Sequence, residues 1–429
     1  MYSFIIFLYA LAVYIVAFFG HKKARKMVRG QMKTWHKLKY RIDKNEKYIW
    51  FHAASLGEFE QGRPLIERIK KEHPEKKILL TFFSPSGYEV RKDYPYADVV
   101  CYLPFDTKIS AKAFLHYVKL EKVFFIKYEF WRNYITQLKK KNVPIYSVSS
   151  IFRRKQIFFR WYGWWYKYML RRFTHFFVQD ERSKELLATL GVNQVTVMGD
   201  TRFDRVIDIM KASKEFPLVD KFTYRAENQK KNQTDIEKYD DKFPVLVCGS
   251  TWPVDEEFII PYFNRNFRMK MVLAPHVVSE EHLQQIEQKL TRPSVRYTKA
   301  SKEEIDKAEC LIIDCYGLLS SVYRYATVAY VGGGFGVGIH NVPEAAVYGI
   351  PVIIGPNNEK FREAQQLLEI GGCKEVNNAR EFEKLLDTFF AHPELKKRAG
   401  EAAGNYIMDH AGAAEKIYRF VFQSEEEKD

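Results

Sequence analysis

Short apolar runs alternate with amphipathic stretches over much of the chain. The runs of the first half have strand length and lie at residues 48–51, 78–83, 99–103, 123–126, 145–148, 176–178 and 195–198. Between them, stretches such as 59–71 and 111–118 carry apolar residues at helical spacing. Alternating strands and helices of this kind are typical of a mainly parallel sheet with helices on both faces.

The same alternation resumes in the second half after a polar break. The apolar runs there lie at residues 245–248, 271–273, 311–313, 328–331 and 352–354. Residues 211–242 are polar and lack apolar periodicity, which is typical of a linker between domains. The pattern predicts an α/β protein of two Rossmann-like domains facing a cleft. We expect the domains at residues 30–210 and 243–405, followed by a C-terminal closing helix and tail at 406–429.

The first 19 residues carry no charge, and we predict an anchor helix at residues 1–20. A helix of that length covers about 30 Å, the thickness of a bilayer's hydrocarbon core. Basic residues follow the apolar run, and their charge keeps that side in the cytoplasm: Lys22, Lys23, Arg25 and Lys26. A cleaved signal peptide would instead carry positive charge before the run and small residues at its end. We therefore expect an uncleaved anchor with a cytoplasmic catalytic body.

A segment near the middle of the first half mixes aromatic and basic side chains. Seven of the nine residues at 158–166 are aromatic. Such a mixture along a helix favours a membrane interface, where rings lie at headgroup depth and basic groups meet lipid phosphates. The alternative is a helix that packs its rings into the core. The membrane reading assigns lipid or acceptor contact to Arg153, Arg154, Arg160, Trp161, Trp164 and Trp165.

Composition and charge narrow the range of partners. The chain has 429 residues, of which 46% are hydrophobic, so it is long enough for two folded domains. Its net charge of +15 favours an anionic partner, namely a nucleic acid, an acidic membrane or a phosphorylated substrate. The five cysteines lack C-x-x-C spacing, which predicts core thiols in a reducing compartment and no zinc site.

The stretch from His52 to Glu58 is the first candidate for chemistry. It follows an apolar run and then opens a helix, which places Glu58 at the C-terminal tip of a strand, where open α/β sheets bind their ligands. Glu58 is therefore a candidate general base. The same residues also fit a capping box, in which Ser55 caps the helix and the Glu58 carboxylate returns to the N-cap amide.

A glycine-rich stretch at residues 331–346 is the second candidate. Glycines after a strand let backbone amides approach a phosphate, and Glu344 in the next helical turn suits the hydroxyls of a ribose. The alternative is a structural turn with Asn341 as N-cap. The chain has no G-x-G-x-x-G fingerprint here, no P-loop and no D-x-D metal motif. Helix dipoles and basic side chains would then neutralise a nucleotide leaving group.

Other turns also follow predicted strands and are expected at the edge that faces the cleft. In the second half these are residues 249–252, 274–276 and 314–318, which with the glycine-rich stretch predict a nucleotide pocket. In the first half they are residues 52–58, 84–87, 104–106, 127–131 and 147–150. We therefore expect the acceptor substrate in the first half.

Five motifs resemble those of the 3-deoxy-D-manno-octulosonic acid (Kdo) transferases in order and rough spacing. They are His52-Ala-Ala-Ser-Leu-Gly-Glu58, Tyr128-Glu-Phe-Trp131, Gly199-Asp-Thr-Arg-Phe-Asp204, Gly249-Ser-Thr251 and His340-Asn-Val-Pro-Glu344. The resemblance covers residues 1 to about 410. It implies a GT-B glycosyltransferase that moves Kdo from CMP-Kdo to a lipid A precursor on the cytoplasmic face of the inner membrane. It also implies no bound metal or other cofactor.

The resemblance further implies roles for individual residues. Glu58 would accept the proton of the acceptor hydroxyl, while Glu129 and Arg202 would support the transition state. The donor would be bound by Ser250, Thr251, Pro275, His276, Tyr316, Gly317, Leu318, Gly333, Gly334, Asn341 and Glu344.

The chain departs from the commoner family pattern in three places. Residues 274–276 are Ala-Pro-His in place of Pro-Arg-His, which leaves no arginine there for the CMP phosphate. Residues 316–318 are Tyr-Gly-Leu in place of Met-Gly-Glu, so only backbone contacts carry over. Arg202 replaces a frequent lysine, which keeps the charge and changes the geometry.

Three other functions fit parts of the sequence. A GT-B enzyme with another nucleotide sugar and a lipid acceptor is the nearest alternative. A membrane-tethered nucleic-acid-binding protein would account for the net charge, but no RRM, KH or helix-turn-helix pattern is visible, and we expect no nucleic-acid partner. A scaffold without catalysis would make no use of Glu58. The expected partners are thus CMP-Kdo, a lipid A precursor and an anionic inner-membrane surface.

Overall fold

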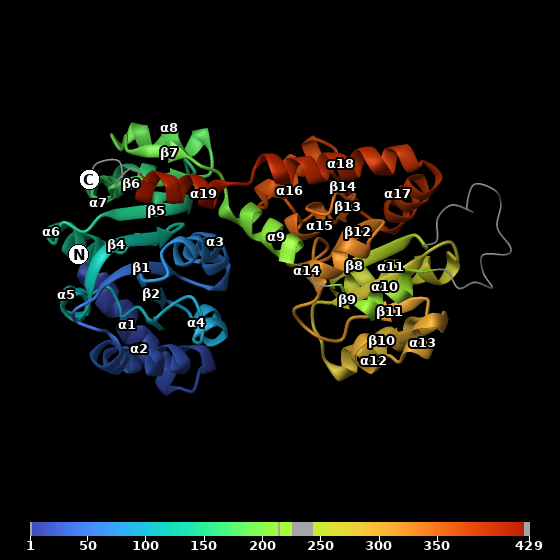
Figure 1. Cartoon of the computed structure of the whole chain (residues 1–429), viewed down its shortest axis with the longest axis horizontal. Helices are drawn as coiled ribbons and strands as arrows, with labels where there is room; N and C mark the ends of the chain where they lie inside the picture. The colour runs from blue at the N-terminus through green and yellow to red at the C-terminus, as the bar shows by residue number, and fades with distance from the viewer. Residues whose placement is uncertain (1, 213–214, 225–242, 424–429) are drawn as a thin grey trace. The chain divides into compact units, whose positions relative to one another are not determined.

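The computed structural model describes residues 2–212, 215–224 and 243–423. It divides into two compact units, of which the first comprises Met1–Arg205 and His410–Asp429 and the second Val206–Asp409. Each unit has one seven-stranded sheet covered by helices (Figure 1). All strand pairs are parallel, as the alternating pattern predicts. The predicted α/β class with two Rossmann-like domains is confirmed.

The first unit has the strand order β3-β2-β1-β4-β5-β6-β7. Its strands are β1 (Lys47–Ala53), β2 (Lys77–Phe82), β3 (Val99–Tyr102), β4 (Lys119–Ile126), β5 (Ile145–Ser150), β6 (His175–Val178) and β7 (Val195–Val197). Its helices are α1 (Tyr2–Phe18), α2 (Lys22–Arg41), α3 (Leu56–Glu72), α4 (Pro85–Arg91), α5 (Lys108–Tyr117), α6 (Arg132–Lys140), α7 (Trp164–Leu170), α8 (Glu181–Thr189), the start of α9 (Thr201–Ala212), and α19 (Ala413–Tyr418).

The central strand β1 contributes to a core on each face of the first sheet. Trp50 packs with Phe125 and Tyr134 on one face, and Phe51 stacks on Phe124 on the other. Neighbouring side chains of a strand point to opposite faces, and both faces are covered by helices. The strand therefore appears in the sequence as a continuous apolar run rather than as an alternating one.

The C-terminal segment returns to the first unit. In Figure 1 the red helix α19 lies among the elements of that unit, and it packs against α3. Tyr418 and Phe422 join the core beneath α3, and the Tyr418 hydroxyl lies 3.0 Å from His73 Nε2. An ion pair of 2.9 Å between Arg68 and Glu415 adds to this contact. The last helix of the chain is thus part of the first unit's core.

The second unit repeats the architecture with the order β10-β11-β9-β8-β12-β13-β14. Its strands are β8 (Val245–Thr251), β9 (Lys270–Pro275), β10 (Ser294–Arg296), β11 (Cys310–Ile312), β12 (Val328–Val331), β13 (Val352–Ile354) and β14 (Cys373–Glu375). Its helices are α10 (Pro217–Thr223), α11 (Pro253–Arg265), α12 (Glu280–Lys289), α13 (Lys302–Lys307), α14 (Leu319–Val322), α15 (Pro343–Ala346), α16 (Arg362–Glu369), α17 (Ala379–Ala391) and α18 (Pro393–Asp409).

The apolar pattern does not reveal β10 and β14, the two edge strands of the second sheet. Each has three residues. Ser294 of β10 and both Lys374 and Glu375 of β14 are exposed, whereas Arg296 of β10 is buried. An edge strand has a neighbour on one side only, and polar residues there disfavour pairing with other chains. The apolar periodicity that marks a central strand is therefore missing from both.

Part of the predicted linker is folded. Helix α10 lies within residues 211–242, and its Val219 and Phe222 are fully buried. The Lys270 ammonium donates to the Phe222 carbonyl at 2.8 Å, and burial lowers the pKa of Lys270 to about 8. Residues 213–214 and 225–242 of the predicted linker lie outside the described residues.

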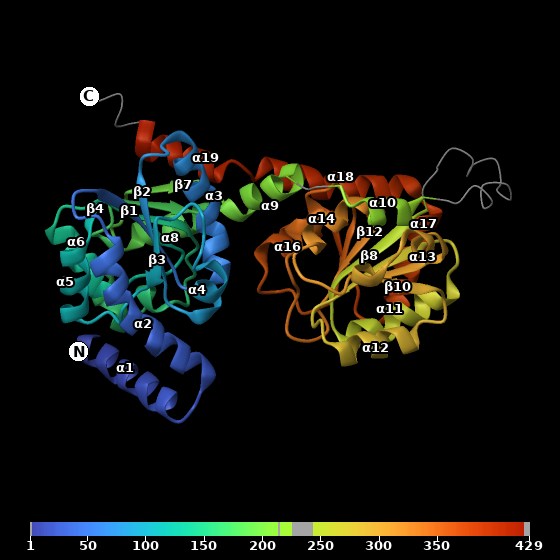
Figure 2. The ribbon, with the colours of Figure 1, turned by 60° about the horizontal axis from the view of Figure 1, so that its bottom comes forward.

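The N-terminal helix α1 lies against the first unit. Figure 2 shows it beside α2 at one end of that unit. Ala10 and Ala17 face inward, while large apolar side chains such as Phe4 (63% exposed) and Phe18 (82%) face out. No single described helix has the length and hydropathy for a membrane span. The pair α1 and α2 meets both conditions together, with a bend of 117° between them.

The aromatic segment is not the continuous helix that its composition predicts. Residues Ile157–Phe159 and Trp161–Gly163 form separate 3₁₀ turns, and α7 starts only at Trp164. A Cβ at Gly163 would lie 1.8 Å from the Ile157 carbonyl oxygen, so the two turns meet where only glycine fits.

The rings of the segment divide between core and surface. Phe158, Phe159 and Tyr166 pack against the first unit's core. Trp161 and Trp164 are 87% and 65% exposed. The core interpretation therefore holds for part of the side chains, and membrane contact by the exposed ones stays a prediction.

The packing of α2 can be tested at Gly30, which lies against a buried tyrosine. A Cβ at Gly30 would lie 2.2 Å from the ring of Tyr102, which is 1% exposed and lies against Tyr88. We expect Gly30→Ala to lower the free energy of unfolding by about 1–3 kcal/mol through overpacking. This is expected although Ala favours helices by about 1 kcal/mol over Gly. Lys33→Ala, at an exposed site of α2, should change it by less than about 0.5 kcal/mol. Guanidinium denaturation measures both, and a stabilised Gly30→Ala protein would contradict the packing.

Candidate active site

The order in which the chain adds strands reverses at the centre of each sheet. From β1 the order runs outward through β2 and β3 to one edge, and then from β4 to β7 toward the other. In the second sheet the corresponding reversal lies between β8 and β12. Loops diverge beyond the carboxyl ends of strands at such a point and leave room for a ligand. The predicted catalytic and donor-binding residues lie at or after the ends of these four strands or of β7, β9 and β11.

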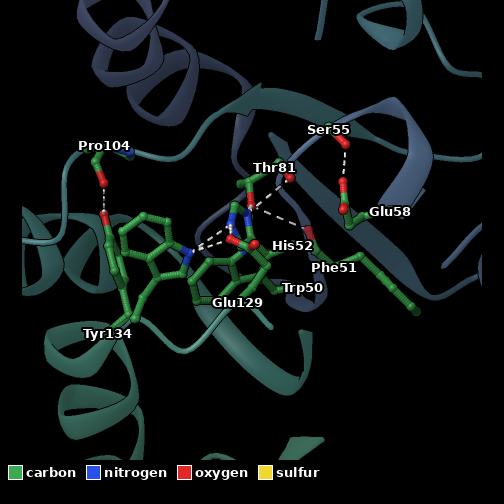
Figure 3. A network of polar contacts seen from close by, with 10 residues as sticks. Trp50, Phe51, His52, Ser55, Glu58, Thr81, Pro104, Glu129 and Tyr134 are labelled. Carbon is green, nitrogen blue, oxygen red and sulfur yellow. Dashed lines mark hydrogen bonds and ion pairs between the residues drawn. The ribbon is translucent and has the colours of Figure 1, made fainter. Parts of the chain in front are cut away.

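A buried polar network lies at the reversal point of the first sheet (Figure 3). His52 on β1 is 0% exposed, and its Nε2 lies 3.1 Å from Glu129 Oε2. On the other side of the ring, Nδ1 lies 2.8 Å from the Thr81 hydroxyl of β2. Trp50 Nε1 donates to that hydroxyl at 2.7 Å, and Trp131 Nε1 donates to Glu129 Oε2 at 2.8 Å. The network thus joins three neighbouring strands, β2, β1 and β4.

Glu58 lies in the first turn of α3, directly after β1. Ser55 is the N-cap, yet its side chain makes no capping bond to the backbone; its hydroxyl donates to the Glu58 carboxylate instead (Figure 3). The capping-box interpretation is therefore wrong for this helix. Glu58 is half-buried, and the N-terminal end of the helix stabilises its anionic form.

Arg202 is oriented by a buried carboxylate that the sequence reasoning did not single out. Its guanidinium donates to Asp200 at 2.8 and 2.7 Å, and Gln61 of α3 donates to the other oxygen of Asp200 at 2.9 Å. Burial opposes the charge of Asp200, but Arg202 and these hydrogen bonds hold its pKa below the ordinary value. Gln61 lies one turn after Glu58 in α3, so its hydrogen bond to Asp200 connects α3 to the start of α9.

The glycine loop after β12 is closely packed and closed by its own hydrogen bonds. A Cβ at Gly332 would lie 2.4 Å from the Ser250 carbonyl oxygen, and one at Gly334 would lie 2.6 Å from Gly355. The Gly333 amide donates to the buried Asp255 carboxylate at 3.0 Å. The amides of Gly332, Gly336 and Gly338 donate to backbone carbonyls. These four amides therefore serve the loop itself rather than a phosphate.

Asn341 and Glu344 lie at the start of α15. The Asn341 side-chain amide donates to the Glu344 carboxylate at 2.7 Å. The N-cap of this four-residue helix is Val342, so the prediction of Asn341 as N-cap is wrong. Tyr316 is 74% exposed, and its hydroxyl accepts from the Val278 amide at 3.2 Å. Next to it, Gly317 has a φ of +92°, which favours glycine.

Three rings stack where β8, β9 and β12 end. The rings of Trp252 and His276 have centroids 4.7 Å apart, and those of His276 and His340 are 4.4 Å apart. Trp252 Nε1 donates to His340 Nε2 at 3.1 Å, so that nitrogen is unprotonated. Burial, and then the neighbouring His276, lower the pKa of His340. Only His276 of the three is a predicted donor-binding residue, although Trp252 lies in a predicted strand-end turn and His340 begins one of the five motifs.

Ser250 and Thr251 end β8 in an unusual backbone. Ser250 has a φ of +54°, a conformation that costs a residue with a Cβ of order 1 kcal/mol or more and is concentrated at functional sites. The buried Thr251 hydroxyl donates to Glu256 at 2.9 Å. Among the residues that the structure describes, no group of three or more His, Cys, Asp or Glu side chains is placed to hold a metal ion.

Known proteins resemble this chain over most of its length. Residues 28–205 match the family model of 3-deoxy-D-manno-octulosonic-acid transferase (kdotransferase). A 3-deoxy-D-manno-octulosonic acid transferase of Aquifex aeolicus is 27% identical over 371 residues, covering 84% of this chain and 91% of its own. A bifunctional glycosyltransferase/methyltransferase of Fusobacterium nucleatum is also 27% identical. The similarity covers 90% of this chain but only 59% of that longer protein.

Solved structures share the fold at low sequence identity. The UDP-GlcNAc 2-epimerase of Neisseria meningitidis superposes with a TM-score of 0.58 at 12% identity, covering 88% of this chain and 100% of its own. MurG of Acinetobacter baumannii gives 0.52 at 9% identity, with coverages of 88% and 99%. These structures show the fold that this chain shares with them. The family model over residues 28–205 and the relatives confirm the resemblance of the chain to the 3-deoxy-D-manno-octulosonic acid transferases.

Proposed function

We propose that this protein transfers Kdo from CMP-Kdo to a lipid A precursor of the lipid IVA type in lipopolysaccharide synthesis. The observation that carries the proposal is the family match over residues 28–205, a stretch that includes Glu58, Glu129 and Arg202. All three lie at or beyond the C-terminal ends of strands in the first sheet, where α/β proteins bind substrates.

The proposed reaction is a direct displacement at the anomeric carbon of Kdo. A hydroxyl oxygen of the acceptor attacks this carbon and forms the new glycosidic bond, while the bond to the CMP phosphate oxygen breaks and its electron pair leaves with CMP. Glu58 takes the hydroxyl proton. Proton transfer accompanies the attack, when the hydroxyl is most acidic.

Glu129 and Arg202 act on the charge that develops during this displacement. The sugar acquires oxocarbenium-like positive charge, which the Glu129 carboxylate stabilises. Arg202 offers positive charge to anionic groups of the substrates, and its bonds to Asp200 hold it in place before substrate arrives. No cofactor takes part, and the proposal assigns no metal to the transfer.

The donor is proposed to bind at the reversal point of the second sheet. The stacked rings of Trp252, His276 and His340 form a rigid wall there. Asn341 and Glu344 offer amide and carboxylate groups for ribose hydroxyls. Because the amides of Gly332, Gly333, Gly336 and Gly338 bond within the protein, we assign most of the CMP charge to side chains and the end of α15.

The lipid acceptor and the inner-membrane surface are proposed to meet the outer faces of the first unit, on the cytoplasmic side. The exposed apolar side of α1 and the exposed Trp161 and Trp164 fit acyl chains and headgroup depth. Arg153, Arg154 and Arg160 are exposed in the same aromatic segment and fit phosphate groups.

Glu58→Gln tests the general base. The amide cannot accept the proton, so we expect transfer to fall by about 10²–10⁴-fold while the affinity for CMP-Kdo is unchanged. Transfer is measured by mass spectrometry of the glycolipid, and donor affinity by calorimetry. Glu72→Gln, in the last turn of the same helix, should behave as wild type. Wild-type turnover by Glu58→Gln would remove Glu58 from this role.

A donor panel tests the substrate and the absence of a metal requirement. Purified protein is incubated with tetra-acylated lipid A precursor and either CMP-Kdo, another CMP-sugar or UDP-GlcNAc, with and without EDTA. We expect product only with CMP-Kdo and the same rate with EDTA. Product from another nucleotide sugar alone would establish the other GT-B activity instead. Loss of activity in EDTA that a divalent cation restores would overturn the metal-free mechanism.

The basic part of the aromatic segment makes a further prediction about membranes. Arg153→Gln/Arg154→Gln removes two charges that each contribute about 1 kcal/mol at an anionic surface, so binding to anionic vesicles should weaken by roughly 10- to 30-fold. Lys384→Gln/Lys397→Gln, at exposed sites of the second unit, is the charge-matched control. Vesicle flotation at low and high salt measures both. Equal losses in the two variants would mean that net charge, not this segment, binds the membrane.

A further inference from the structure

His52 is a fully buried histidine whose two ring nitrogens both have partners. Nε2 faces Glu129 at 3.1 Å, and Nδ1 faces Thr81 at 2.8 Å from its hydroxyl and 3.2 Å from its carbonyl oxygen. Such a ring holds two neighbours in place at once. Which nitrogen carries the hydrogen decides what His52 can do for Glu129.

The hydrogen-bond donors around Thr81 determine the tautomer. Trp50 Nε1 can only donate, so the Thr81 hydroxyl oxygen accepts from it. The single hydroxyl hydrogen of Thr81 then has two acceptors in reach, His52 Nδ1 at 2.8 Å and the Phe51 carbonyl at 3.4 Å. The shorter contact is the stronger bond. The Thr81 carbonyl, which would accept a hydrogen from Nδ1, lies farther from that nitrogen, at 3.2 Å. Nδ1 therefore accepts, and the hydrogen of the neutral imidazole lies on Nε2, directed at Glu129.

Trp131 completes the arrangement around the carboxylate. Its single indole hydrogen lies between two acceptor positions, Glu129 Oε2 at 2.8 Å and His52 Nε2 at 3.0 Å. Since Nε2 already carries a hydrogen, the indole donates to the carboxylate, which is also the closer group. Oε2 of Glu129 thus accepts two N–H bonds, while Oε1 makes no hydrogen bond to the residues that the structure describes.

The loop that carries Glu129 is held on the backbone side as well. Lys127, two residues earlier, has a φ of +59°, which is uncommon for a residue with a side chain. Its carbonyl accepts from the Ser150 hydroxyl at 2.9 Å. The backbone and one oxygen of Glu129 are thus fixed by separate contacts, and its second oxygen is left for another group.

We propose that His52 is a positioning residue of the transfer reaction: its Nε2–H, with the Trp131 indole, fixes Glu129 so that Oε1 faces the reacting sugar. This inference rests on the proposed role of Glu129 in stabilising the transition state. His52 itself touches no substrate. Hydrogen bonds from Trp50 to Thr81, from Thr81 to His52 and from His52 to Glu129 link the carboxylate to the packed core of the sheet.

The first test separates His52→Leu from His52→Gln. Leu has a similar volume but no donor, so Glu129 keeps one bond of two; we expect kcat to fall about 10- to 100-fold, the range for small misplacement of a catalytic group. KM for CMP-Kdo should stay within about twofold, because Glu129 acts in the transition state. Gln places an N–H near the position of Nε2 and should restore most of the rate. An equal loss in both variants would overturn the proposal.

A double-variant cycle tests whether His52 acts through Glu129. If it does, His52→Leu/Glu129→Gln should be no slower than Glu129→Gln alone. Multiplying effects would show that His52 contributes independently and would overturn the positioning role. A wild-type rate for Glu129→Gln would instead remove the proposed role of Glu129, so the two failures are distinguishable.

The tautomer has its own signature. In protein labelled with ¹⁵N-histidine, long-range ¹H–¹⁵N spectra should show His52 with its hydrogen on Nε2. Thr81→Ser keeps the hydroxyl and should preserve both this signal and the rate. Thr81→Val removes the hydroxyl, and we expect the hydrogen to redistribute to Nδ1 and kcat to fall. A hydrogen on Nδ1 in the wild-type protein would contradict the assignment.

Discussion

The parallel pairing of every strand is the constraint on which this molecule depends. When all strands of a sheet run the same way, their carboxyl ends emerge at one edge, and each loop there begins at a fixed place. Glu58 follows β1, Glu129 follows β4, and Arg202 follows β7 of the same sheet. These three residues are far apart in the sequence, and the sheet places the strands that precede them side by side with their ends at one edge.

Because both faces of each sheet are buried, a polar group inside lowers the stability of the fold unless it is hydrogen-bonded. His52, Thr81 and the Trp50 indole lie in the first sheet's core, and each is satisfied by another of the three or by Glu129. In the second unit Asp255 does comparable work by accepting from the Gly333 amide and the Tyr330 hydroxyl. In both places a buried polar contact connects the rigid core to a loop at the sheet edge.

The hydrogen-bond partners in the folded structure also differ from those that two local motifs predict. Ser55 and Glu58 have the spacing of a capping box, yet the hydroxyl binds the carboxylate rather than the backbone. The glycines after β12 have the composition of a phosphate loop, yet four of their amides serve the protein. In each case the spacing drew attention to the residues, and the folded structure decided which partner each group takes.

The sequence by itself determined the α/β class, the central strands, the position of the strand-end motifs and the resemblance to the Kdo transferases. These follow from local periodicity and residue order, which the chain carries in short stretches. The edge strands β10 and β14, the folding of α10, the return of α19 to the first unit and the division of the aromatic segment came only from the tertiary structure. So did Asp200 and the hydrogen-bond direction through Thr81 and His52. Each depends on groups brought together from distant positions, because burial and pairing are properties of the packed chain and not of any single stretch.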